Sequence, residues 1–183
     1  AGIDLAIRRG TAPKSGESWT QLVPEMVVPV CSPSLRQSIF VDDEVELLGH
    51  APLIHVTTVR EDWRSWFEAR GIAPPSNERA IRVDTIQLAA EGAMRGLGIA
   101  MGRKPLIDEY LVQGSLLEIA GPAIPADTSY WLVGTQLAFD RPETKLFRAW
   151  ILQELRDRDR PPAPVAAAMP RPKVIPRRLG IGK

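Results

Sequence analysis

The pattern of apolar and polar positions predicts a chain in which short strands alternate with helices. Short apolar runs bounded by glycine, proline or polar residues indicate strands. They lie at residues 3–8, 25–31, 53–56, 80–83, 98–101, 116–119 and 129–135. Apolar residues at helical spacing indicate helices at residues 61–70, 85–95, 104–112 and 142–156, after a short helix opened by Ser32-Pro33. Such alternation is typical of an α/β fold with a mainly parallel sheet.

The segment at residues 82–101 is the most informative, because it predicts a strand, a capped helix, a glycine turn and a second strand. The apolar residues of its helix recur on one face, namely Ile86, Ala89, Ala90, Ala93 and Leu97. We expect Asp84 to cap this helix and Leu97 to be buried at its end. A helix that begins at the carboxyl end of a strand is a frequent ligand site in α/β proteins.

Composition supports a folded core and argues against a nucleic-acid-binding face. Apolar residues make up 44% of the chain, and five residues are Trp. The formal charge of +1 hides an asymmetry, because residues 156–183 hold eight Lys/Arg against two Asp/Glu. Residues 1–155 are therefore mildly acidic, which is unlike a nucleic-acid-binding domain.

The ends and the single cysteine suggest a setting for the chain. Residues 158–183 are rich in proline and arginine, so we predict a disordered tail there. Cys31 is the only cysteine, which excludes an internal disulfide and fits a reducing compartment. No apolar run approaches the roughly 18 residues that span a bilayer. We expect a cytoplasmic protein without a membrane partner.

Polar residues at the ends of the central elements are candidate ligand contacts. Thr85 offers a hydroxyl, and the following residues offer amides, to an anionic or polar ligand at the start of the helix. Plain helix capping is the alternative, above all for Asp84. Thr57 and Thr58 follow the strand at residues 53–56, where open α/β sheets bind ligands; local hydrogen bonds are the alternative.

Four further candidates lie outside this central segment. Asp4 and Arg8 fall on one side of the first strand, as cleft residues or as a surface ion pair. Tyr130 either lines a cleft or packs in the core, and Ser32 is first a helix cap and second a cleft residue. The two histidines lack companions with metal-ligand spacing, so we expect no metal and no cofactor.

Four segments in this order resemble the effector-binding region of LysR-type transcriptional regulators, nearest to the glycine-cleavage activator and β-lactamase regulator branch. They read GIDLAIRRG at residues 2–10, VPVCSPSL at 28–35, VDT at 83–85 with GLGIA at 96–100, and SYWLV at 129–133 before FRAW at 147–150. The sequence DWRSW at residues 62–66 adds to the likeness. The order of the motifs is more specific than any one of them.

The resemblance implies a two-lobed fold similar to periplasmic binding proteins, with a small polar effector between the lobes. Residues 1–30 and 126–157 would form the later half of the first lobe, and residues 31–125 the second lobe. The family also places a ligand-contacting hydroxyl at Thr85 and an acidic residue near the cleft at Asp4. The opening of the first lobe and the winged helix-turn-helix would lie before Ala1, so we expect an N-terminally truncated regulator with an incomplete first lobe.

Two consequences for partners follow from the resemblance. DNA contact would require the missing helix-turn-helix, and the full-length protein would be a homodimer or homotetramer. Two other classes of protein stay open, namely a periplasmic-type solute-binding protein and a truncated gene product without a role. An enzyme is not expected, because no Ser–His–acid order, Walker loop or nucleophile elbow occurs.

Overall fold

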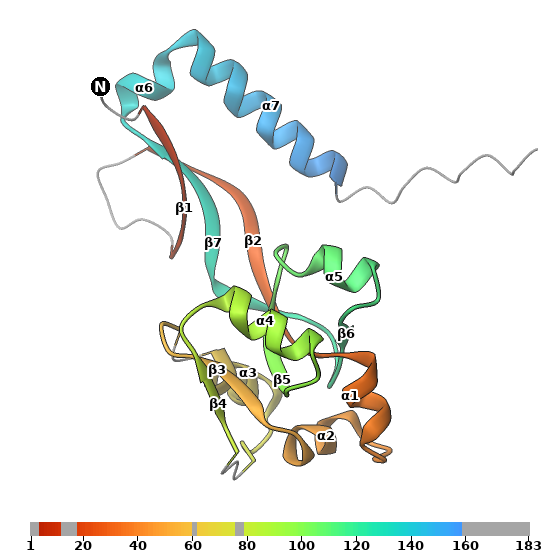
Figure 1. Ribbon diagram of the computed structural model, residues 1–183. Helices are drawn as coiled ribbons and strands as arrows, with labels where there is room; N and C mark the ends of the chain where they lie inside the picture. Colours follow the sequence, from red (N-terminus) through yellow and green to blue (C-terminus); the bar gives the residue numbers. More distant parts are fainter. Residues whose placement is uncertain (1–3, 12–17, 60–61, 76–78, 159–183) are drawn as a thin grey trace, which may run out of the picture.

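The computed structural model describes residues 4–11, 18–59, 62–75 and 79–158 (Figure 1). These residues form a seven-stranded sheet in the order β1-β7-β2-β5-β3-β4, with β6 paired to β2. The strands are β1 (Leu5–Gly10), β2 (Ser18–Cys31), β3 (Leu53–Val56), β4 (Ile81–Val83), β5 (Ile99–Lys104), β6 (Leu117–Glu118) and β7 (Ile124–Gly134). The helices are α1 (Pro33–Ser38), α2 (Glu44–His50), α3 (Asp62–Arg70), α4 (Ile86–Met94), α5 (Asp108–Val112), α6 (Gln136–Asp140) and α7 (Pro142–Arg158).

The sheet is mixed, and the prediction of a mainly parallel sheet is wrong. Strand β2 pairs antiparallel with β5, β6 and β7, and β1 pairs antiparallel with β7. Strand β3 pairs in parallel with β4 and β5. The antiparallel share is large because β2 and β7 are much longer than predicted. The sequence pattern revealed only the apolar end of β2, at residues 25–31.

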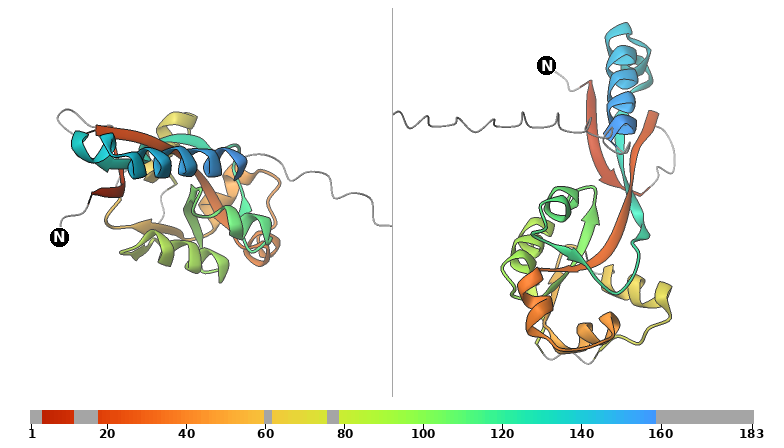
Figure 2. Two further views of the ribbon diagram at one scale, coloured as in Figure 1. Left: turned by 90° about the horizontal axis from the view of Figure 1, so that it is seen from above. Right: turned by 90° about the vertical axis from the view of Figure 1, so that its right-hand side faces the viewer.

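Strands β2 and β7 connect two parts of the molecule. Figures 1 and 2 show both strands running from the part that holds β1, α6 and α7 into the part that holds α1 to α5. The register of the pair shifts between Gln21 and Val23 and again between Pro24 and Met26. Such bulges bend and twist a strand pair, and proline in a strand is tolerated at them.

The second part has an apolar cluster on each face of its sheet. Neighbouring strand residues alternate between the two faces; thus Leu53 joins one cluster and Ile54 the other. The first cluster includes the aromatic residues of α3, namely Trp63, Trp66 and Phe67, which are buried. The second cluster includes the alanines of α4. Because both faces are covered, β3 and β5 read as short continuous apolar runs.

Helix α4 differs from its prediction at both ends. Thr85, not Asp84, is the N-cap, and its side chain accepts a hydrogen bond from the Leu88 amide. Leu97 is 56% exposed, so the expectation that it is buried is wrong. The reason is that the helix ends at Met94, and Gly96 has a φ of +73° that turns the chain away from the apolar face.

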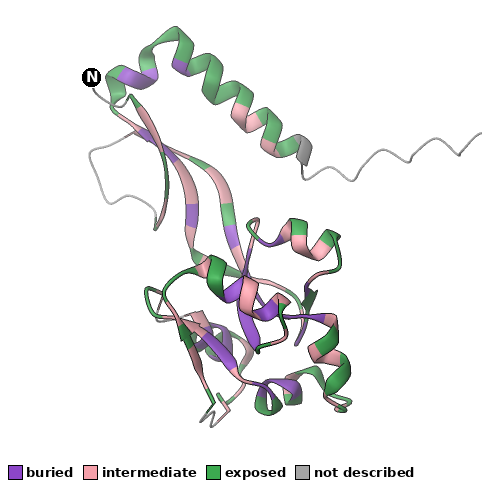
Figure 3. Cartoon of the chain, viewed as in Figure 1, coloured by how far each residue is buried: buried purple, intermediate pink, exposed green. Residues whose placement is uncertain are grey.

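Other boundaries also shift. Helix α5 begins at Asp108 and not at the predicted residue 104, because Lys104 still belongs to β5, where it pairs with Met26 of β2. Helices α2 and α6 are absent from the sequence prediction. Helix α7 begins at the predicted residue and runs two residues further than predicted, to Arg158. Its apolar stripe is mostly uncovered (Figure 3), with Leu146 73% and Trp150 57% exposed. The predicted tail beyond residue 158 and most of the loop at residues 10–17 lie outside the described residues.

Among the described residues, no helix is both long enough and apolar enough to cross a membrane.

Candidate functional site

The carboxyl ends of β3 and β4 bring four of the predicted residues together. The Thr57 amide donates to the Val83 carbonyl at 2.8 Å, and the Thr58 hydroxyl donates to the Asp84 carbonyl at 3.2 Å. Thr85 follows at once as the cap of α4. Because β3 and β4 are parallel, their carboxyl ends meet at one edge of the sheet.

A cavity of about 420 Å³ opens at this edge, between the strand ends and the start of α3. Its lining residues come from β3, β4, β5, α3 and the loop after β3: Ile54, His55, Val56, Thr57, Val59, Asp62, Trp63, Arg82 and Met101. Thr57 is the predicted residue in the wall itself. Thr58 follows Thr57 and donates to the Asp84 carbonyl, and Thr85 comes next after Asp84 in the chain; these three residues lie beside the wall and do not line it.

The cavity wall carries a cation, a carboxylate and a neutral imidazole. His55 and Arg82 are register partners across β3 and β4. Burial lowers the pKa of His55, and the nearby charge of Arg82 lowers it further. Burial raises the pKa of Asp62, although attraction to Arg103 opposes this shift. Neutral His55 and the hydroxyl of Thr57 can exchange hydrogen bonds with a polar ligand, and Arg82 can hold an anionic group.

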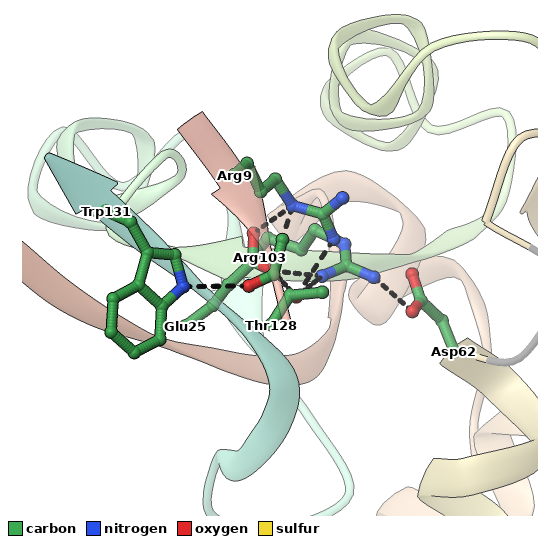
Figure 4. Close-up of polar contacts among 7 residues, drawn as sticks. Arg9, Glu25, Asp62, Arg103, Thr128 and Trp131 are labelled. Atoms are coloured by element: carbon green, nitrogen blue, oxygen red, sulfur yellow. Dashed lines mark hydrogen bonds and ion pairs between the residues drawn. The ribbon is translucent and has the colours of Figure 1, made fainter. Parts of the chain in front are cut away.

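Asp62 also belongs to a group of polar side chains that we call the hinge cluster: Arg9, Glu25, Asp62, Arg103 and Thr128 (Figure 4). The group joins β1, β2, β5, β7 and α3. At its centre, the Glu25 carboxylate accepts from Arg9 Nε at 2.9 Å and from Arg103 Nη1 at 2.5 Å. Arg103 Nη2 donates to Asp62, and the Thr128 hydroxyl donates to Glu25.

These charges are buried but compensated. The side chains of Glu25 and Arg103 are 0% and 2% exposed. Burial by itself raises the pKa of Glu25. Hydrogen bonds from Arg9 and Thr128 and the charge of Arg103 outweigh it, so the pKa lies below its usual value. Arg103 Nε has no hydrogen-bond partner among the described residues.

Tyr130 lies beside the hinge cluster on β7. Its register partners are Arg9 on β1 and Val23 on β2. Burial raises the pKa of Tyr130, and the negative charge of Glu25 raises it further, while the two arginines oppose the shift. The phenol is therefore protonated at neutral pH and keeps an O–H that can donate a hydrogen bond.

The remaining three predicted residues lie elsewhere. Asp4 pairs with Arg141 at 2.9 Å, at the end of β1 opposite to Arg9. Ser32 is buried and caps α1. Its hydroxyl lies close to Gly96, 3.4 Å from where a Cβ on that residue would stand. Ser32 is therefore near the C-terminal end of α4, whereas Thr85 is at the N-terminal end. Arg8 is exposed on β1, one residue from Arg9. The structure does not bring these three side chains to the cavity.

Sequence reasoning missed the hinge cluster as a group. A signal was present, because Glu25 begins the predicted strand at residues 25–31 and Arg103 lies two residues after the one at 98–101. Charged residues in or near buried strands are almost never fully buried without partners. That signal does not identify the partners, which come from strands far apart in the sequence. The described residues contain no group of three or more His, Cys, Asp or Glu side chains that could hold a metal ion.

Comparison with known proteins shows the relationship of the chain. The transcriptional regulator DsdC of Escherichia coli is 29% identical over 162 residues, which are 85% of this chain and 52% of DsdC. The transcriptional activator AmpR of Rhodobacter capsulatus is 29% identical over 157 residues, 82% of this chain and 50% of AmpR. The chain thus spans about half the length of the curated relatives that it matches.

Solved structures show the same fold. The effector-binding domain of AmpR from Citrobacter freundii superposes with a TM-score of 0.71 at 24% identity, over 85% of this chain and 76% of that one. The effector domain of AmpR from Pseudomonas aeruginosa gives 0.69 at 23% identity, over 85% and 74%. Residues 1–156 match the family described as the LysR substrate binding domain. The chain belongs to this family, with the mixed α/β fold of LysR effector-binding domains.

Proposed function

We propose that this chain is the effector-sensing part of a LysR-type transcriptional regulator, and that a small polar molecule binds in the cavity at the carboxyl ends of β3 and β4. The observation that supports this most directly is the cavity itself, which combines Thr57, His55, Asp62 and Arg82 in one wall. Few convergent polar groups in a concave, partly apolar site are typical of small-molecule binding.

Binding controls transcription if the effector has different affinities for two arrangements of the lobes. In this proposal the lobes are residues 1–30 with 126–157, and residues 31–125, and β2 and β7 join them. Closure around the effector would move the lobes about these strands and reorient DNA-binding domains in a homodimer or homotetramer. The helix-turn-helix that contacts DNA would belong to the remainder of such a regulator, which acts in the cytoplasm.

Thr85 can serve both as a cap and as a ligand contact. Its Oγ1 accepts from the Leu88 amide at 3.2 Å, and the hydroxyl hydrogen stays available to donate. Thr57, Thr58 and Asp84 would complete the polar edge, and Tyr130 would contribute from β7. The side chains of Asp4 and Ser32 already have partners away from the cavity, so the geometry gives them other roles.

Thermal-shift screening of small polar molecules against this chain tests the proposal. We expect at least one compound to raise the melting temperature in a saturable way, as ligands of the folded state do. Compounds found in this way would then be titrated by calorimetry. Each compound would also be titrated against the variant Thr57→Val. If every compound binds this variant as tightly as the unchanged chain, binding in this cavity is contradicted.

Thr85→Val and Thr135→Val form a matched pair for the same assay. Each threonine caps a helix through one hydrogen bond of 3.2 Å, to the amides of Leu88 and Ala138 respectively. Each variant should lose about 1 kcal/mol of stability because a cap is removed. Only Thr85→Val should also lower the affinity for the ligand, because Thr135 caps α6 in the other part of the molecule. Equal affinity in both variants would remove Thr85 from the site.

A further inference from the structure

Arg103 physically connects the cavity wall to the two crossing strands. Its guanidinium donates through Nη2 to Asp62, which lines the cavity at the start of α3. Through Nη1 it donates to Glu25 on β2 at 2.5 Å and reaches Thr128 on β7 at 3.5 Å. Figure 4 shows Arg103 between Asp62 on one side and the Glu25–Thr128 pair on the other.

The shape of arginine makes this connection stiff. A guanidinium is planar and carries its donors in a fixed fork, so one end cannot turn while the other keeps its geometry. Arg103 is also 2% exposed and Glu25 is 0% exposed. Neither group can exchange its partner for water, because an unpaired buried charge is strongly unfavourable. A change at Asp62 must therefore be accommodated at Glu25 and Thr128.

Asp62 is the member of the hinge cluster that a ligand can reach. It lies in the cavity wall, its side chain is 15% exposed, and a carboxylate can accept several hydrogen bonds. A ligand ammonium, amide or hydroxyl that donates to Asp62 would compete with Arg103 for the same carboxylate.

We infer that Arg103 is a positioning residue that couples the occupancy of the cavity to the geometry of β2 and β7. A ligand group that donates a hydrogen bond to Asp62 weakens the hydrogen bond between Asp62 and Arg103. The guanidinium then shifts toward Glu25 on β2 and Thr128 on β7. The inference rests on the proposed function, since it describes how that site would signal. It goes further by naming the side chains that carry the signal and the ligand chemistry, a hydrogen-bond donor, that starts it.

Hydrogen–deuterium exchange on the ligand-free chain tests the coupling independently of any effector. Asp62→Asn removes the charge that holds Arg103 while keeping the size of the side chain. We expect several-fold faster amide exchange in residues 25–31 and 124–130, the crossing segments of β2 and β7, as well as at the start of α3. Faster exchange confined to α3, or spread evenly over all elements, would overturn the inference.

Glu68→Gln is the matched control. Glu68 lies on the same helix as Asp62 and pairs with Arg64 at 2.8 Å, but both side chains are exposed. Exposed ion pairs contribute little, so this variant should leave the exchange of β2 and β7 unchanged. Accelerated exchange of both strands in Glu68→Gln would show that they respond to any change in α3 and would equally overturn the inference.

A double-mutant cycle between Asp62→Asn and Glu25→Gln provides a second readout. The two carboxylates share Arg103. When both are neutral, Arg103 loses every anion in the cluster. The decrease of the urea midpoint in the double variant should therefore exceed the sum of the decreases in the two single variants. In an Arg103→Met background the excess should vanish. Additivity with Arg103 present would refute the coupling even if the thermal-shift screen finds an effector.

Discussion

Cys31 and His55 illustrate, at the residue scale, how burial changes the chemistry of a side chain. Cys31 is 0% exposed, and burial raises the pKa of its thiol to about 11; the charge of Arg36 opposes the shift and that of Glu44 adds to it. Burial lowers the pKa of His55 and so keeps its imidazole neutral. Both shifts have the same main cause, because a low-dielectric surrounding disfavours the charged form of each group.

Cys31 should therefore be unreactive in the folded chain. At about pH 8 a thiol-specific reagent should label it slowly, because the thiolate is the nucleophile and is scarce at that pH. Labelling should become fast in urea, where the thiol regains its ordinary pKa and its exposure. Rapid stoichiometric labelling without denaturant would contradict the buried position of the side chain.

Helices α3 and α7 show, at the scale of elements, that one sequence pattern can have two outcomes. Both carry aromatic residues at helical spacing, a pattern that is typical of a helix that packs through one apolar face. In α3 the aromatic side chains are buried in the first apolar cluster, whereas in α7 Trp150 is 57% exposed. A hydrophobic face identifies what a helix is able to bury, and its neighbours decide whether that face is covered.

Replacing each tryptophan by alanine should give very different costs. Trp66 is 0% exposed, so Trp66→Ala should lower the free energy of unfolding by about 3–5 kcal/mol, through lost burial and the cavity that remains. Trp150→Ala should cost less than about 1 kcal/mol, because substitutions at exposed sites change stability little. Urea unfolding of this chain measures both values; similar losses would mean that α7 is covered in solution.

For the whole molecule, the pH dependence of stability follows from the buried titratable groups. The pKa of His55 is lowered from 6.5, so the unfolded chain binds this proton first as the pH falls. The contribution of His55 is complete above pH 6.5 and is lost as the pH falls toward its folded-state pKa. Glu25 acts at lower pH, because its pKa is lowered from 4.5 and its contribution is lost as the pH falls through the folded-state value.

We expect the urea midpoint to decrease between about pH 7 and about pH 5, the range in which histidine titrates. His55→Gln should remove most of this decrease. His50→Gln is the control, since it replaces the other histidine, which is exposed on α2; the decrease should be smaller in His55→Gln than in His50→Gln. A steep profile that survives in His55→Gln would assign the dependence to another group.

Local features of the fold were predictable because they depend on local physics. The helix start at Ser32-Pro33 and the helix at α3 are confirmed. Thr57, Thr58 and Thr85 were also predictable as polar residues at strand ends, since each strand and the polar residues after it are visible in the sequence; that the ends of β3 and β4 lie together came from the structure. The cap of α4 was missed by one residue, because Asp84 and Thr85 are both good caps and only the backbone geometry separates them.

By itself, the sequence determined the order of the strands and of the helices other than α2 and α6, and the family resemblance, since these follow from neighbouring residues and from periodicity. Only the tertiary structure decided that β2 and β7 cross the molecule as long antiparallel partners, and that α7 keeps its apolar stripe exposed. It alone assembled the hinge cluster, whose Arg9, Glu25 and Arg103 are distant in the chain. The physical reason is that a buried charge needs an opposite charge in contact with it, and such contacts are made by strand pairing across the sheet.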